Sequence, residues 1–422
     1  MDSDTYLAAN IEGSDPSERV AVIGAGYAGL AAAVTLAQRG KRVTVFESGP
    51  LPGGRARRVT TAGRTLDNGQ HILVGAYTTL LGLMRTVGAD PDALLLRIPL
   101  ELRYVRNFRL RAPALPAPLH LAAALVTATG LNWRERFRAV MFMQGMKRAR
   151  YRVSIELSVA GLLEAHDQSI NICRYLWHPL CISALNTLPQ FASANAFLAV
   201  LRDSLGGPRS ASELLMPRVD LTELFPAPAA KWLAAHGGEI RCGAPVRELG
   251  PVLTEFGQVI VAVGPHQLEP LLPGMTGDYT YQPIYTIYLK YPRQVKLDLP
   301  MLGLAEGIVQ WVFDRGRLGG EPGLLACVIS AQGDHQQMEH DELAATCHRE
   351  LESAIGNLPK PEWTQVIAEK RATVTCVPGI RRFGPRTDVP NVFLAGDYTD
   401  PEYPPTLEAA VLSGIRAAQH VP

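Results

Sequence analysis

The feature that most constrains the fold is a glycine-rich turn near the start of the chain, within RVAVIGAGYAGLAAAVTLAQRGKRVTVFE, residues 19–47. This segment combines an apolar strand, a glycine turn, an alanine-rich helix and a second strand that ends in an acid. Gly24, Gly26 and Gly29 match G-x-G-x-x-G, whose glycines permit a tight turn, the approach of a pyrophosphate and the packing of helix on strand. Glu47 follows Gly29 by 18 residues, where a carboxylate accepts hydrogen bonds from an adenosine ribose. The segment predicts a Rossmann-type α/β fold that binds a dinucleotide.

The same turn begins a helix, and the free amide groups at a helix N-terminus bind anions. We therefore expect Tyr27 and Ala28 to face the phosphates. The next segment, GPLPGGRARRV, places Gly53, Gly54 and Arg55 directly after the acidic strand end. These three residues resemble the Gly-Gly-Arg element of the flavin amine oxidase and carotenoid desaturase superfamily. The resemblance implies that they support the pyrophosphate of FAD rather than NAD, whereas Arg55 taken alone is equally typical of a solvated basic turn.

The other end of the chain supplies a second half-site in NVFLAGDYTDPEYPPTLEAAVLSGIRAA. An apolar strand over residues 392–395 leads into Gly396 and Asp397, and a proline-rich turn then starts a helix near Thr406. Asp397 could accept hydrogen bonds from the ribityl hydroxyls of a flavin. The amides at the start of the helix could meet the pyrimidine edge of the ring, where reduction concentrates negative charge; they belong to Thr406, Leu407 and Glu408. The plainer alternative is a capped helix entrance.

A polar run interrupts an otherwise apolar stretch in TLDNGQHILVGAY, residues 65–77. Asp67 and Asn68 are typical of a turn shaped by their own side chains, while the segment 72–74 predicts a short buried strand. The turn would carry polar groups toward the cofactor, and the residues expected to contact it are Gly69, Gln70 and His71. His71 is the first candidate for a catalytic role next to the flavin, and a structural imidazole that binds backbone is the alternative.

Two termini that build one cofactor site imply a discontinuous domain. We predict a disordered leader at 1–18, an FAD-binding domain from 19–77, 239–275 and 377–422, and a substrate domain from 78–238 and 276–376, helical in its first part and a sheet in its second. Within the FAD-binding domain, RCGAPVREL, residues 241–249, predicts a strand with Val246 near adenine. QVIVAVGPHQLEPLL predicts another strand followed by a glycine turn at Gly264. The superfamily places a three-stranded meander between these two segments; here only GPVLTEFG separates them, so the adenine contacts are open.

Composition excludes several classes of protein. A formal net charge of +1 over 422 residues gives no electrostatic case for nucleic acid. The six cysteines have no spacing typical of a zinc site or a disulfide framework, so we expect no metal and a reducing, cytoplasmic setting. The first residues lack the basic and apolar regions of a secretory signal, and no segment is long and apolar enough to span a bilayer.

The segment 119–152 mixes apolar and basic side chains at helical spacing, in an apolar run followed by WRERFRAVMFMQGMKRARYR. This mixture is compatible with an amphipathic helix on an anionic bilayer at the inner face of the cell membrane. It is also compatible with a core helix that has a solvated basic face, and the sequence favours this alternative slightly.

Several segments together are similar to the squalene-associated FAD-dependent desaturases of hopanoid-making bacteria, a family of hydroxysqualene dehydroxylases. They are LDNGQHILVGAY, WHPLCISALNT, VLRDSL, MPRVDLTELFPAPAAKWLAAHGG and GDYTDPEYPPTLEAAVLSG. The resemblance implies an FAD enzyme that removes the hydroxyl of hydroxysqualene with hydride from reduced flavin, in squalene and hopanoid biosynthesis beside squalene-synthase-like enzymes. Such chemistry needs an acid and a dry, apolar tunnel. Asn186, in SALNT, is a second candidate for polar chemistry in that tunnel, with a helix cap as the alternative.

Two other functions remain open at this stage. The cofactor motifs do not set the direction of electron flow, so an oxidative desaturase or an amine oxidase fits them as well. A non-catalytic lipid carrier on the same scaffold is the other, although the glycines and acids of the cofactor motifs are present.

Overall fold

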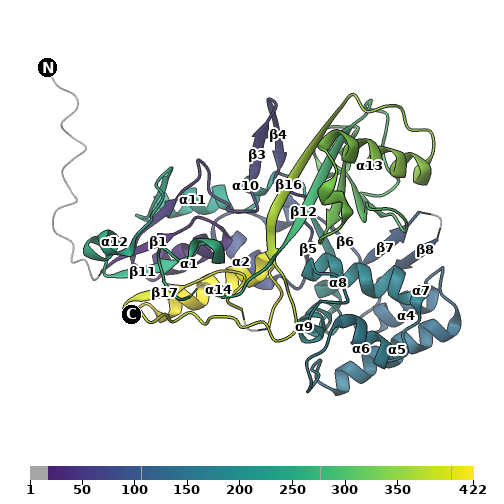
Figure 1. The fold of residues 1–422 in the computed structure, drawn as a ribbon, viewed down its shortest axis with the longest axis horizontal. Coiled ribbons are helices and arrows are strands. Elements are labelled where there is room, and N and C mark those ends of the chain that lie inside the picture. The colour runs from purple at the N-terminus through teal and green to yellow at the C-terminus, as the bar shows by residue number, and fades with distance from the viewer. Residues whose placement is uncertain (1–17, 106, 276, 401) are drawn as a thin grey trace.

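The computed structural model describes residues 18–105, 107–275, 277–400 and 402–422 (Figure 1). The predicted leader therefore lies, apart from residue 18, outside the described residues.

A five-stranded parallel sheet forms the first half of the molecule. Its order is β10-β2-β1-β11-β17, and the strands are β1 (Arg19–Ile23), β2 (Arg42–Glu47), β10 (Glu239–Cys242), β11 (Gln258–Val261) and β17 (Val392–Leu394). Val20 and Val22 point to the face covered by α1 (Tyr27–Gln38) and α14 (Leu407–His420), whereas Ala21 and Ile23 point to the face covered by α12 (Leu249–Glu255). Both faces are buried, which explains the continuous apolar runs of these strands. The predicted Rossmann-type α/β fold is confirmed.

The two ends of the chain meet in this half. Helices α1 and α14 lie side by side in Figure 1, the one purple and the other yellow. They approach so closely that a Cβ on Gly414 would stand 2.0 Å from the carbonyl oxygen of Ala28. Glycine at this position of α14 is therefore a packing requirement, and it fixes the C-terminal segment next to the N-terminal turn.

A seven-stranded sheet forms the second half. Its order is β16-β12-β15-β14-β13-β7-β8, and the strands are β7 (Glu101–Tyr104), β8 (Phe108–Arg111), β12 (Tyr281–Lys290), β13 (Met301–Gly303), β14 (Trp311–Asp314), β15 (Leu324–Ser330) and β16 (Trp363–Val374). Helix α13 (His340–Ile355) covers one face and a layer of helices covers the other. The sheet predicted from residues 276–376 is present. The prediction missed β7 and β8, which come from the stretch expected to be helical.

Residues 78–238 are otherwise mostly helical, as predicted. The helices are α2 (Thr78–Thr86), α3 (Pro91–Leu94), α4 (Leu119–Thr127), α5 (Trp133–Arg148), α6 (Val159–Ala165), α7 (Ile170–Ile172), a π-helical turn (Cys173–Trp177), α8 (His178–Leu185), α9 (Ala194–Ser204), a 3-10 turn (Arg209–Ser212), α10 (Leu221–Leu224) and α11 (Pro226–Ala235). Three further 3-10 turns lie at Pro265–Gln267, Gly316–Leu318 and Asp334–Gln337. Two small sheets are formed by β3 (Arg58–Thr61) with β4 (Arg64–Asp67), and by β5 (Leu73–Val74), β9 (Leu214–Pro217) and β6 (Leu95–Ile98).

Two details differ from the predictions. The strand expected over 241–249 ends at Cys242, because Gly243 adopts a φ of +69° and Pro245 has no N–H to donate. The short segment in place of the meander forms helix α12.

Helices α2 and α11 pack in the same core cluster as α1 and α14, although their residues fall in the range predicted for the substrate domain. The domain boundaries therefore stay predictions.

Candidate active site

Only glycine fits at two positions of the turn that follows β1. Gly24 has a φ of +104°, and its amide donates to the carbonyl oxygen of Phe46 at 2.7 Å. A Cβ on Gly29 would stand 1.9 Å from the carbonyl oxygen of Gly24. The turn and the first turn of α1 are thus held against each other, as the spacing of the glycines predicts.

The second glycine is different, because the protein leaves space beside it. Gly26 forms an isolated bridge with Gly53, whose amide donates to the carbonyl oxygen of Ala25 at 2.8 Å. A Cβ on Gly26 would meet only the Cα of Gly54 within 4 Å, at 3.8 Å. Among the described residues, no side chain forms a capping hydrogen bond at Gly26, where α1 begins. The two glycine segments therefore form a cradle of backbone with room for a phosphate group.

Glu47 lies between this cradle and the segment after β10. One carboxylate oxygen, Oε2, accepts from the amide of Ala25 at 2.8 Å, and Oε1 accepts from the amide of Gly49 at 2.7 Å. The amide of Ala244 donates to the carbonyl oxygen of Glu47 at 2.9 Å. This bond holds the segment that leads to Val246 beside the end of β2. On the other side of β1, Gly264 follows β11 and its amide donates to Oε1 of Gln267 at 3.3 Å. Adenosine contacts by Glu47, Val246 and Gly264 stay predictions that this arrangement supports.

Arg55 and Asp397 are predicted as cofactor residues from opposite ends of the chain, and the structure joins them directly. Nη2 of Arg55 lies 2.7 Å from Oδ2 of Asp397, and Nη1 donates to the carbonyl oxygen of Ala372 at 2.7 Å. Burial lowers the pKa of Arg55, but the Asp397 carboxylate, together with Glu369 and Tyr281, opposes this effect and raises the pKa overall. Oδ1 of Asp397 is buried and has no partner among the described residues. A buried carboxylate oxygen without a donor is costly, so this atom is suited to a ligand hydroxyl such as those of the ribityl chain.

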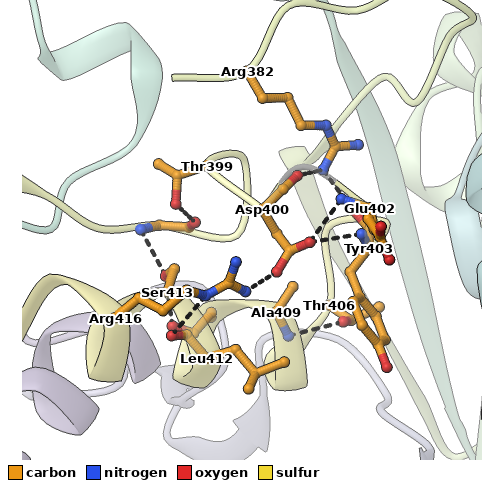
Figure 2. A network of polar contacts seen from close by, with 12 residues as sticks. Arg382, Thr399, Asp400, Glu402, Tyr403, Thr406, Ala409, Leu412, Ser413 and Arg416 are labelled. Carbon is orange, nitrogen blue, oxygen red and sulfur yellow. Dashed lines mark hydrogen bonds and ion pairs between the residues drawn. The ribbon is translucent and has the colours of Figure 1, made fainter. Parts of the chain in front are cut away.

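The loop between Asp397 and α14 is held by buried charge, as Figure 2 shows. Oδ1 of Asp400 accepts from the amides of Glu402 and Tyr403 at 2.9 and 2.7 Å, and Oδ2 pairs with Arg416 of α14. Arg382 donates to the carbonyl oxygens of Asp400 and Tyr403. This network fixes where α14 begins. Sequence analysis did not identify Asp400, Arg382 or Arg416. The one available signal was Asp400 itself, an acid within the proline-rich turn.

The start of α14 serves two purposes. Oγ1 of Thr406 accepts from the amide of Ala409 at 3.2 Å and caps the helix, which is the plainer of the two predicted uses of this turn. The Glu408 carboxylate accepts from the amides of Thr79 and Leu80 at 2.9 and 2.8 Å, so it caps α2 from across the core. Burial raises the pKa of this carboxyl group. Contact between a flavin ring and the amides of Thr406, Leu407 and Glu408 stays a prediction.

The polar turn after β4 is anchored by its first two residues. Oδ1 of Asp67 accepts from the amide of Leu221 at 2.8 Å, and Oδ2 lies 3.5 Å from Nη2 of Arg315. Burial raises the pKa of Asp67 to about 6, against the opposing effect of Arg315. Nδ2 of Asn68 donates to the carbonyl oxygen of Arg55 at 2.9 Å and to Glu369 at 3.0 Å. Both side chains fix the turn, but through residues distant in sequence rather than through the local Asx hydrogen bonds that were expected.

The three following residues lie against β12 and Arg315. Gly69 has a φ of +99°, and the amide of Gln70 donates to Oγ1 of Thr286 at 3.2 Å, while Oε1 of Gln70 accepts from Arg315 at 3.1 Å. His71 donates from Nδ1 to the carbonyl oxygen of Gly69 at 3.2 Å, which leaves Nε2 of the neutral ring without a proton. Burial lowers the pKa of His71, and the Arg55 charge adds to this effect. Sequence analysis did not identify Arg315 or Thr286, because no local pattern marks them.

Asn186 occupies a left-handed position with a φ of +46°, where it ends α8. Its Nδ2 donates to the carbonyl oxygens of Gln282 and Pro283, both at 3.3 Å, and to Oγ1 of Thr373 at 3.1 Å. Its Oδ1 accepts from the amide of Ala331 at 2.7 Å. The side chain therefore ties the end of a helix to the sheet, which matches the helix cap offered as the alternative. A catalytic role for Asn186 stays a prediction without support from these contacts.

A cavity of about 800 Å³ lies between the helices and the seven-stranded sheet. Its wall includes Tyr104 and Trp311 from the sheet and Cys173, His178 and Ile182 from the helical layer, but none of the predicted cofactor residues. Side chains of the sheet lie between the cavity and the polar turn that follows β4.

Three of these side chains lie in register from one strand to the next. Thr286, which contacts Gln70, pairs with Val328, and Val328 pairs with Trp311 on the cavity wall. Residues directly opposite in antiparallel strands share a face, and strands lie about 4.8 Å apart, so the cavity begins about 10 Å from Thr286. The packing around this row is apolar.

Within the described ranges, no helix combines the length and apolar character that crossing a membrane requires. The same residues contain no group of three or more side chains placed to hold a metal ion.

Residues 27–422 match the family model of flavin containing amine oxidoreductases, and the chain belongs to this family. It is an FAD-dependent oxidoreductase, and the backbone cradle and the free oxygen of Asp397 fit that cofactor. Among curated relatives, the hydroxysqualene dehydroxylases of Rhodopseudomonas palustris and Sinorhizobium fredii are each 29% identical; the alignments cover 96% and 95% of this chain and 98% and 97% of theirs. A zeta-carotene desaturase of Zea mays is 22% identical over 96% of this chain and 84% of its own.

Solved structures agree on the fold. Putrescine oxidase with bound putrescine has a TM-score of 0.68 at 18% identity, covering 96% of this chain and 98% of the other. Cyclohexylamine oxidase from Brevibacterium oxydans has a TM-score of 0.66 at 19% identity, covering 96% and 98%. The predicted two-domain amine oxidase-like architecture is therefore confirmed.

Proposed function

We propose that this protein removes the hydroxyl group of hydroxysqualene to give squalene and water, in bacterial squalene and hopanoid biosynthesis. The observation that carries the proposal is similarity along almost the whole chain to relatives that are named hydroxysqualene dehydroxylases. Reduced FAD, when bound, supplies the hydride and is oxidised. The allylic C–O bond breaks, a C–H bond forms at the same carbon, and the hydroxyl leaves as water after it takes up a proton.

The residues around the polar turn have to orient the alcohol, exclude water and provide the proton. The apolar packing next to Thr286, Val328 and Trp311 keeps water away, and the cavity beyond it has room for an apolar chain. His71 and Asp67 stand at the end of that row, but their protonation differs. The lowered pKa of His71 makes its ring neutral near pH 7, whereas the raised pKa of Asp67, about 6, leaves part of that carboxyl group protonated. Asp67 is held by Leu221 and Arg315, so His71 remains the residue proposed to face the substrate. Because the neutral ring carries its only proton on Nδ1, it has to take up a second proton at Nε2 before it can pass one to the hydroxyl group.

The same proposal includes squalene-synthase-like enzymes as functional partners, because they make the alcohol that this reaction consumes. It also includes a cytoplasmic location with peripheral contact to the inner face of the cell membrane, where an isoprenoid of this size dissolves.

Anaerobic turnover with chemically reduced FAD and hydroxysqualene tests the reaction. Squalene should form in proportion to the FADH2 oxidised, as measured by gas chromatography and by the return of flavin absorbance. The control is oxidised FAD without a reductant, which should give no squalene. If squalene is absent anaerobically and a dehydrogenated product appears in air, the protein is an oxidative desaturase, as the similarity to a carotene desaturase would allow.

His71→Ala is expected to keep FAD and to lower kcat by about 10²-fold or more, the usual range for a positioned proton-transfer group. The ring hydrogen-bonds only the Gly69 carbonyl among the described residues, so its loss should leave the fold intact. Flavin absorbance reports binding, and stopped-flow oxidation of reduced flavin by hydroxysqualene reports the chemical step.

The matched control is His348→Ala, because His348 hydrogen-bonds Tyr291 on the side of the sheet covered by α13. That variant should turn over like the wild type. Wild-type kcat in His71→Ala would assign His71 to a structural role.

A further inference from the structure

Helix α5 carries apolar side chains on two opposite faces. Ala139, Phe142 and Met146 are buried in the core of the helical layer. Trp133, Phe137 and Met141 follow one another at intervals of four residues, so they form a stripe along the other side of the helix. Trp133 is 70% exposed and Phe137 is 59% exposed. A core helix with a solvated basic face, the alternative favoured by sequence, accounts for the first face and leaves the second unexplained.

The stripe continues onto the neighbouring helix. Leu119 and Val126, seven residues apart on α4, are also exposed. Arg136 of α5 donates to the carbonyl oxygens of Val126 and Ala128, both at 2.6 Å, and so fixes the end of α4 against α5. All exposed large apolar side chains of the described residues fall between Leu115 and Phe191. Such a concentration on one part of a surface marks an interaction site.

The charge around the stripe identifies the partner. Seven basic residues and one acidic residue lie in the segment 131–152, in a chain whose net charge is +1. The acid, Glu135, is buried and occupied: it accepts from the amide of Asn132 at 2.8 Å and from Ser169 at 2.7 Å. The exposed surface of α5 therefore presents arginines and lysine beside tryptophan, phenylalanine and methionine, with no carboxylate among the described residues of this helix face. Apolar side chains flanked by cations fit the interface of an anionic bilayer.

The cavity opens at the same end of the molecule. Arg138 of α5 is part of its wall, and so is Ile170, which is 89% exposed at the start of α7. Figure 1 places α4, α5, α6 and α7 together, away from the five-stranded sheet. A lipid in contact with the stripe would thus be next to the cavity rather than next to the cofactor cradle.

We propose that α4 and α5 dock on an anionic lipid bilayer, with Trp133, Phe137 and Met141 inserted among the lipids and the cavity beside the membrane surface. That the bilayer hands a lipid substrate to the cavity rests on the proposed function. The docking itself does not require it.

Flotation with vesicles tests the surface without any turnover. Wild-type protein with FAD bound should float with vesicles of phosphatidylcholine and phosphatidylglycerol, and more weakly with phosphatidylcholine alone or at raised ionic strength. The double variant Trp133→Ser/Phe137→Ser should lower binding to the anionic vesicles about tenfold or more, since the inserted apolar area sets the strength of such binding. Arg134→Glu/Arg148→Glu should remove the preference for anionic lipid. Arg349→Glu, an exposed charge change on α13, is the matched control and should bind as the wild type does.

Retained flavin absorbance and an unchanged thermal transition would show that the surface variants are folded. Wild-type protein that does not float, or a Trp133→Ser/Phe137→Ser variant that binds within twofold of it, would overturn the proposal. So would a double variant that changes only the oligomeric state, because the stripe would then bind a second copy of the chain. A failure to form squalene from hydroxysqualene leaves this result untouched, so the proposed reaction and the proposed docking surface fail separately.

Discussion

Gly26→Val is expected to give a folded protein that binds FAD about 10- to 100-fold more weakly than the wild type. Gly26 has a φ of −73° and a ψ of 179°, an extended conformation that valine adopts readily. A Cβ there would be in ordinary van der Waals contact with the Cα of Gly54, at 3.8 Å. The protein accommodates the added Cβ, whereas a pyrophosphate in the cradle would meet the new side chain. Added atoms in a close-packed contact cost about 1–3 kcal/mol, which gives the expected factor.

Two other glycines provide matched controls for this variant. Gly82→Val also puts a β-branched residue in place of glycine, in α2, and a Cβ there meets nothing within 4 Å, so FAD should stay bound. Gly29→Val should fail to fold, because its Cβ would overlap the carbonyl oxygen of Gly24 at 1.9 Å. Flavin titration gives the affinity, and thermal unfolding of the three apoproteins compares their folds without the stabilising effect of ligand. Wild-type FAD affinity in Gly26→Val would show that the cradle does not hold the pyrophosphate.

The cofactor cradle could be predicted from sequence because its requirements are local. The positive φ of Gly24 and the contact of Gly29 with Gly24 are set within a few residues, and only glycine meets them. Strand β8 was equally readable: FRLR alternates buried and exposed side chains with a period of two, and the helical interpretation of the surrounding region overrode that signal.

Long-range side-chain pairs could not be predicted in the same way. Arg55 and Asp397 were each expected near FAD, but their direct ion pair depends on how two segments 342 residues apart meet in the fold, which the spacing of neither motif encodes. Arg315 reaches Asp67 and Gln70 from a different sheet, and its own segment carries no distinguishing pattern. The two stripes of α5 show the same limit, because the sequence contains both faces and only the fold decides which one is covered.

Asp400→Ala is expected to lower the free energy of unfolding by about 2–4 kcal/mol and to release FAD. Asp400 is 2% exposed, and its carboxylate holds two backbone amides and Arg416 (Figure 2). Removing one member of a buried ion pair leaves the other charge and two amides without partners, and that cost exceeds the net value of the contacts. Arg416 is partly exposed and can recover some solvation, which places the estimate at the lower end of the range for buried pairs. Urea unfolding of the apoprotein measures the loss.

Asp400 itself is not expected to touch the cofactor. The loss of FAD should instead follow from the displacement of residues that Asp400 holds in place. Its network fixes the loop that joins Asp397 to Thr406, so both the free carboxylate oxygen and the start of α14 would move when it is broken. Asp400→Asn keeps an oxygen acceptor for the two amides and loses only the charge opposite Arg416, so it should retain more stability and more FAD than Asp400→Ala. Glu402→Ala removes a carboxylate whose ion pairs with Arg152 and Arg202 are solvent-exposed, and it should change neither quantity by much. Equal FAD affinity in Asp400→Ala and the wild type would mean that Asp397 and α14 hold their positions without this loop, and that the cofactor site depends on the N-terminal cradle alone.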